Sequence, residues 1–167
     1  MKKSLVLFSF LSIIALSSKA QEYKNAVGIR LGPNSPAISP GFTFKHFLNE
    51  TNAVEGIIGL SNGIGLCALY QWHHPIESVE HLHWFVGAGG YAAFRSATTY
   101  TVNKVDGSSS TVRSNNSYIG ATGIVGLDYK FDQIPLNISL DWKPELNVLT
   151  TVGFEASAVG VSARFTF

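Results

Sequence analysis

The chain has 167 residues, of which 46% are hydrophobic and only 14% are charged, and its formal net charge is +1. An ordinary soluble domain carries about 25% charged residues, so this composition disfavours a disordered chain and a coiled coil. The weak net charge disfavours nucleic acid as a partner, and the single cysteine excludes a framework of internal disulfides.

Residues 1–20 have the three parts of a secretory signal peptide. Two lysines follow the first Met, an apolar stretch broken only by serines runs over 5–16, and Ala20 ends a small-x-small cleavage pattern. The apolar stretch is too short to be a membrane helix, which needs about 20 residues. We therefore predict cleavage after Ala20 and a single domain over 21–167.

The remaining chain alternates apolar and polar residues with a period of two, which is typical of strands with one apolar face. It has no run of 18 apolar residues that would indicate a membrane helix. The alternation is clearest at the end, where one face carries Val159, Val161, Ala163, Phe165 and Phe167. Turn residues separate the segments. We predict eight strands, over 23–32, 40–48, 52–60, 63–73, 81–95, 117–131, 135–145 and 154–167.

One connection is much longer than the others. Residues 96–116 are rich in Ser, Thr and Asn, and an Asp106-Gly107 turn signal lies at the tip. We expect either a mobile loop or a β-ribbon that rises beyond the strands.

The residue composition of the polar strand face distinguishes a soluble barrel from a membrane barrel. In a soluble barrel this face meets water and carries many Lys and Glu residues. Here it is mostly Gly, Ala, Ser, Thr and Asn with isolated charges, which suits the lumen of an eight-stranded barrel that side chains just fill. We therefore predict an all-β fold, an eight-stranded antiparallel up-and-down transmembrane β-barrel, located in the cell outer membrane and surrounded by outer-membrane lipid.

Aromatic residues gather near the strand ends on the apolar face. Membrane barrels carry such aromatic girdles at both bilayer interfaces, on either side of an aliphatic band. If the amino-terminus is periplasmic, the connection 96–116 faces outward, where such barrels place their long loops. The predicted girdle at one rim comprises Trp72, Trp84, Tyr129, Phe131 and Phe165.

These patterns resemble a known family. Phe167 ends an alternating strand, which resembles the C-terminal signal by which the barrel-assembly machinery recognises Gram-negative outer-membrane proteins. The blocks 126–144 and 84–90 are similar to segments of small, OmpA/OmpX-like outer-membrane barrels of the porin-like superfamily, most of them uncharacterised. The resemblance covers the whole mature chain. It implies location, fold and the assembly machinery as a partner, and no catalytic residues.

Isolated charges in a narrow lumen are costly, so those on the inward face should pair. Lys45, Lys130 and Lys143 fall on this face by parity. A proton or ion path is one interpretation, and a plug of ion pairs that fills the barrel is the favoured one. We expect Asp141 to meet Arg164 or Arg95. The predicted lumen network comprises Arg30, Glu55, Arg95, Asp128, Asp141 and Arg164.

The segment 73–83 is crowded with histidines and glutamates. His81 and His83 have the spacing of two ligands on one strand face, but no zinc-type ligand pattern is complete. A polar turn is the favoured interpretation, so we predict no metal and no cofactor. Cys67 lacks a nearby histidine in the sequence and is interpreted as a small space-filling residue.

The sequence therefore predicts a monomeric barrel with a filled lumen and no enzymatic activity. Its role is structural, or consists of binding an unknown extracellular partner through outward loops, chiefly 96–116. Three alternatives stay open: a narrow porin-like channel, a lipid A-modifying enzyme and a soluble periplasmic barrel that binds an apolar ligand. The enzyme would need a serine, a histidine and an acid together at the outer rim, and 96–116 contains no histidine.

Overall fold

The computed structural model describes residues 23–32, 40–60, 63–95, 98–103, 109–114, 117–148, 153–156 and 159–167. For Arg95, Glu155 and the two segments 98–103 and 109–114 it describes the backbone alone. The predicted signal peptide and the Asp106-Gly107 turn lie outside the described residues. Within the described part of the chain, no helix is long and apolar enough to cross a membrane.

The described strands are antiparallel to every neighbour with which they pair. In chain order they are β1 (Asn25–Leu31), β2 (Gly41–Phe47), β3 (Asn52–Gly59), β4 (Gly63–Pro75), β5 (Leu82–Arg95), β6 (Thr98–Asn103), β7 (Ser109–Ser114), β8 (Ser117–Lys130), β9 (Leu136–Trp142), β10 (Glu145–Asn147), β11 (Gly153–Glu155) and β12 (Val159–Thr166).

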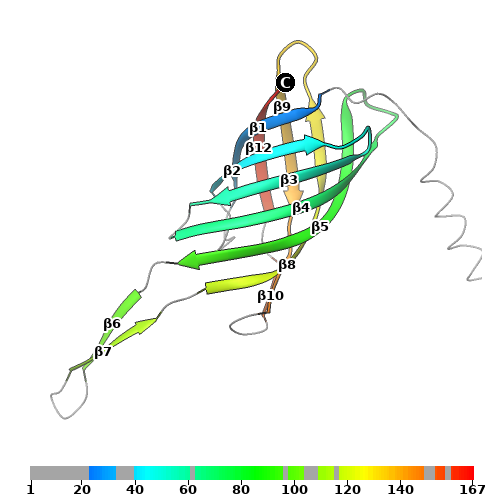
Figure 1. Cartoon of the computed structure of the whole chain (residues 1–167). Coiled ribbons are helices and arrows are strands. Elements are labelled where there is room, and N and C mark those ends of the chain that lie inside the picture. Colours follow the sequence, from blue (N-terminus) through cyan, green and yellow to red (C-terminus); the bar gives the residue numbers. More distant parts are fainter. Residues whose placement is uncertain are drawn as a thin grey trace, which may run out of the picture.

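The first and last strands meet, and this closes the sheet into a barrel (Figure 1). β1 pairs with β2 on one side and with β12 on the other, while β8 pairs with both β5 and β9. In the described residues the closed order is β1-β2-β3-β4-β5-β8-β9-β12, an eight-stranded up-and-down barrel. The predicted fold is therefore confirmed.

Two of the predicted strands are interrupted. The seventh is divided into β9 and β10 by Pro144, which has no N–H to donate to the ladder. The Pro144 carbonyl still accepts a hydrogen bond from the Gly123 N–H at 3.1 Å, so the strand stays attached to β8. The eighth is divided into β11, which pairs with β10, and β12, which pairs with β9.

The barrel has two different ends. At one, here called the terminus end, the N–H groups of Asn25 and Phe167 each donate to the other residue's carbonyl at 2.9 Å. The connections 48–51, 76–81 and 131–135 lie at this end. At the opposite loop end, β5 and β8 lead to the two-stranded ribbon β6–β7, which projects away from the barrel at the lower left of Figure 1. The long connection thus contains a β-ribbon.

Burial follows the predicted alternation, with polar residues inside and apolar residues outside. On β12, Ser162 and Arg164 are buried, whereas Val161 is 49% exposed. Trp72 and Leu140 are 42% and 51% exposed on the outer face. The buried apolar cluster inside is small, and it comprises Ile57, Cys67, Leu69, Phe85, Tyr91, Ala93 and Ile124. The apolar majority therefore faces away from the lumen.

Candidate functional site: the lumen and its terminus end

Charges of both signs balance inside the barrel. Among the residues whose side chains are described, four cationic side chains and four carboxylates are buried. Each cation contacts one carboxylate, which leaves no excess charge in these four pairs. The pairs are Arg30–Asp141, Lys45–Asp128, Lys143–Glu145 and Arg164–Glu55.

The Glu55 carboxylate holds the most connected pair. It accepts hydrogen bonds from Arg164 Nη2 and from Gln71 Nε2, both at 2.5 Å, and from the hydroxyl of Thr43. Arg164 Nη1 also donates to Ser139 Oγ at 2.7 Å. A buried ion pair is tolerated only when further hydrogen bonds satisfy its remaining atoms, and this pair meets that condition.

Asp141 pairs with Arg30, whereas the sequence led us to expect Arg164 or Arg95. The register explains the difference. Asp141 lies opposite Gly160 on β12, and Arg164 lies opposite Asn137, which is four residues before Asp141 on β9. Four residues of a strand span about 13 Å, so Arg164 is at another level of the lumen. The side chain of Arg95 is outside the described structure.

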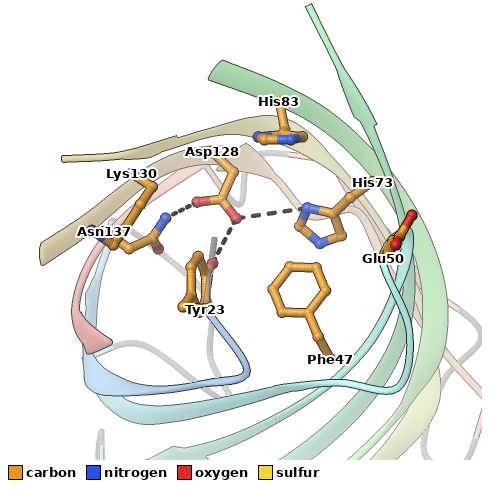
Figure 2. Close-up of a pocket in the computed structure, with 8 residues that line it drawn as sticks. All are labelled: Tyr23, Phe47, Glu50, His73, His83, Asp128, Lys130 and Asn137. Atoms are coloured by element: carbon orange, nitrogen blue, oxygen red, sulfur yellow. Dashed lines mark hydrogen bonds and ion pairs between the residues drawn. The ribbon is translucent and has the colours of Figure 1, made fainter. Parts of the chain in front are cut away.

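Asp128 is the centre of a cluster at the terminus end, drawn in Figure 2. Its carboxylate accepts hydrogen bonds from Lys45 Nζ at 3.1 Å, from the Tyr23 hydroxyl at 3.3 Å and from the Asn137 side-chain amide. His73 Nδ1 lies 3.7 Å from the same carboxylate. Asp128 thus joins β8 to side chains from four other segments.

Aromatic rings surround this cluster. His73 stacks on Phe85 with 5.0 Å between ring centroids, and its ring also contacts that of Phe47, with 4.8 Å between centroids. The ammonium of Lys45 lies 4.7 Å from the centroid of the Phe85 ring, within the range of a cation–π interaction. Aromatic rings therefore pack against both His73 and Lys45 beside Asp128.

The space left among these residues is small. A pocket of about 20 Å³ is lined by Tyr23, Phe47, Glu50, His73, His83, Asp128, Lys130 and Asn137 (Figure 2). A cavity needs about 10–15 Å³ to hold one water molecule. The pocket can therefore hold about one water, and it has no room for an organic substrate.

The two candidate metal ligands do not share a strand face, which corrects the sequence interpretation. His81 is in the turn before β5 with a positive φ of 63°, and its Nε2 lies 2.8 Å from Asp132 Oδ2. His83 lies on β5 and lines the pocket beside Asp128. In the described residues, no group of three or more His, Cys, Asp or Glu side chains is placed to hold a metal ion.

The aromatic residues assigned to the girdle lie on the outer face near the terminus end. Trp72, Trp84 and Phe165 are 42%, 38% and 54% exposed. Tyr129 and Phe131 are half-buried because their rings meet edge to face, with 4.9 Å between centroids. Phe167 is 61% exposed and stacks against Phe165 at 6.2 Å.

Several lumen residues were missed in the sequence. Glu145 has the same parity as Asp141 and Lys143, so extending the alternation across Pro144 would have identified it. Gln71 could have been found in the same way from its position two residues before His73. Tyr23 could not have been found by parity. It begins the first predicted strand, 23–32, with the parity of the outward residue Val27, whereas in the structure it precedes β1 and its hydroxyl reaches Asp128.

No family model matches the chain, and no curated protein matches its sequence. Its fold is similar to a solved structure, the N-terminal β-barrel domain of Pseudomonas aeruginosa OprF, with a TM-score of 0.64 and 15% sequence identity. The match covers 89% of this chain and 100% of the OprF chain. At this identity the likeness concerns the fold, and on that level it supports the resemblance to small eight-stranded barrels.

Proposed function

We propose that this chain is an integral outer-membrane β-barrel protein with a side-chain-filled lumen and a structural or interaction role. The observation that carries the proposal is the inversion of burial. Charged residues occupy the interior, while large apolar side chains cover the outside over all eight barrel strands. A bilayer is the surroundings in which this arrangement is stable, because hydrocarbon requires an apolar exterior.

The outer surface is too apolar for water. Soluble monomers rarely present contiguous apolar patches above a few hundred Å². Here neighbouring strands carry exposed apolar residues at the same level: Ile29 pairs with Phe42, which pairs with Ile58, and these three are 47%, 57% and 48% exposed. The band continues around the barrel, and a soluble ligand-binding barrel would expose all of it.

The filled lumen favours a structural role over that of a channel. Three of the four buried ion pairs, Arg30–Asp141, Lys45–Asp128 and Arg164–Glu55, connect different strands inside the barrel, and the fourth, Lys143–Glu145, joins two residues of one segment. An ion that entered would have to break contacts that compensate the desolvation of both partners. We therefore assign these pairs to filling the barrel and setting its register.

In the proposed orientation the terminus end faces the periplasm and the ribbon β6–β7 lies outside the cell. Outer-membrane barrels have short periplasmic turns and longer external loops. The ribbon is the element we propose to contact an extracellular partner. Recognition of β12 and Phe167 by the barrel-assembly machinery belongs to the same proposal.

Fractionation combined with surface proteolysis tests the location. We expect the protein in the outer-membrane fraction, extracted only with detergent, and cut near Lys104 or Arg113 when trypsin is added to intact cells. Release without detergent would contradict the proposal and favour the soluble barrel. Protection in intact cells together with cleavage in lysed cells would reverse the orientation.

Two further measurements test the role. Purified protein in a planar bilayer should give no steady unitary current, and a reproducible single-channel conductance would favour the narrow channel. The mass of lipid A should be unchanged when the protein is expressed. A defined mass shift, absent from cells with the empty vector, would favour a lipid A-modifying enzyme.

A further inference from the structure

Tyr23 lies across the terminus end of the barrel although it is not part of a strand. The residue precedes β1, whose first residue is Asn25. Its ring meets the Phe47 ring edge to face, with 5.1 Å between centroids and 89° between planes. Its hydroxyl donates to Asp128 at 3.3 Å, and Figure 2 shows the side chain pointing into the pocket.

Two hollows at the terminus end are both lined by Tyr23. On the lumen side is the pocket of about 20 Å³ that contains Asp128 and His73. The second hollow is a wider groove of about 310 Å³, lined by Tyr23, Lys130, Asp132, Gln133, Ile134, Pro135, Thr166 and Phe167. Tyr23 and Lys130 are the two residues that line both.

Of these two shared residues, Tyr23 is the one that can move. Lys130 belongs to β8, and its ammonium donates to the carbonyls of Phe131 and Ile134, the latter at 3.2 Å. Tyr23 lies outside the ladder, although the carbonyl of the next residue, Lys24, accepts a hydrogen bond from the Phe47 N–H at 3.0 Å, and its side chain makes an edge-on aromatic contact and one long hydrogen bond. Such contacts are individually weak, so the ring can leave without unfolding a strand.

We propose that Tyr23 is a stopper for the terminus end of the lumen, and that displacing its ring joins the groove to the pocket at Asp128. The stopper controls access to the cluster of Asp128 and His73 from this end. Which compartment the end faces rests on the proposed function, but the stopper itself does not.

The hydroxyl and the ring of Tyr23 have different roles in the proposed stopper. Burial, and then the charge of Asp128, raise the pKa of Tyr23 well above its ordinary value, so the hydroxyl stays protonated and donates to the carboxylate. The ring supplies the bulk that separates the two hollows. Tyr23→Phe keeps the ring and loses the donor, whereas Tyr23→Ala loses both.

Thiol labelling of the purified, detergent-folded protein measures how readily a small reagent reaches the pocket at Asp128 and His73. Cys67→Ala removes the native thiol, and His73→Cys places a single reporter behind Tyr23 without removing either partner of the Lys45–Asp128 pair. The probe is methyl methanethiosulfonate, which is small and neutral, and mass spectrometry follows the reaction. Tyr129→Ala is the matched control, since it removes an aromatic ring at the same end but on the outer face.

We expect Tyr23→Ala to raise the labelling rate by at least about tenfold, because the ring contact and the hydrogen bond are both lost. Tyr23→Phe should change it by less than about threefold, since the ring is retained, and Tyr129→Ala should leave it unchanged. Equal labelling rates for the folded Tyr23→Ala variant and its parent with the native tyrosine would overturn the proposal. Folding is checked by the heat-dependent gel shift, and Tyr23→Val replaces Tyr23→Ala if that variant fails to fold, with the same expected increase.

Discussion

Arg164 and Glu55 form an ion pair across the lumen, from β12 to β3, with β1 and β2 between them in the barrel wall. Nη2 of the arginine lies 2.5 Å from Oε1 of the glutamate, and both side chains are 1% exposed. The pair connects strands through residues that are 109 positions apart in the chain. It therefore bridges the sheet from the inside, independently of the backbone ladder.

Removing one partner of this pair should destabilise the barrel more than removing both. Glu55→Ala leaves the guanidinium of Arg164 buried and unpaired, which costs about 3–5 kcal/mol of unfolding free energy. Glu55→Ala with Arg164→Met removes the buried charge and should recover a large part of this loss. Urea titration in lipid vesicles, read by the heat-dependent gel shift, measures both. A double variant no more stable than Glu55→Ala would contradict the assignment.

Asp141 should be coupled to Arg30 and not to Arg164. Residues that share an ion pair show coupling energies of about 0.5–3 kcal/mol in double-mutant cycles, and distant residues add to within about 0.5 kcal/mol. We expect Asp141→Ala to lower the unfolding temperature on semi-native gels. Cycles with Arg30→Met and with Arg164→Met should give a large and a small coupling energy, respectively. The reverse order would show that our register for β9 and β12 is wrong.

A charge on the outer face should be costly in a bilayer. Leu140 is 51% exposed within the apolar band, and an arginine at the bilayer midplane costs about 2–4 kcal/mol. Ile134 is similarly exposed, at 48%, but lies in the turn 131–135, where the cost falls to about 0–1 kcal/mol. Unfolding of Leu140→Arg and Ile134→Arg in vesicles measures the difference. If both substitutions change the unfolding free energy by the same small amount, the outer face is exposed to water and the prediction is contradicted.

Two glycines on the barrel wall should respond differently to a methyl group. A Cβ at Gly160 would overlap the guanidinium of Arg30, whereas a Cβ at Gly56 meets nothing within 4 Å. The guanidinium is the flexible end of its side chain, but moving it would disturb the buried Arg30–Asp141 pair, so Gly160→Ala should destabilise the barrel by about 1–3 kcal/mol. Gly56→Ala, the matched control, should be neutral or slightly stabilising, because glycine weakens a strand. The same urea titration compares them. A Gly160→Ala variant as stable as the parent would contradict the prediction that the ion pair fixes the guanidinium against Gly160.

The alternation of residue types was enough to predict the strands and their two faces. Side chains of a strand point alternately to opposite sides, so the sequence near Val161 and Arg164 already separates outer from inner residues. The same rule places Asp128, Asp141 and Glu55 in the lumen. The ends of the strands were less predictable. Pro144 lacks an N–H for the ladder, so it ends β9 and divides the predicted seventh strand, but the alternation of residue types continues across it and hides this division.

The sequence by itself thus determined which face of each strand points into the lumen, how many strands the barrel has, and where its long connection lies. Only the tertiary structure decided which charges meet, that Tyr23 covers the terminus end, and that His81 and His83 diverge. The physical reason is that parity is a local property of the chain, whereas an ion-pair partner depends on the register between strands. Arg30 and Asp141, 111 residues apart, become neighbours only when β12 pairs with both β1 and β9.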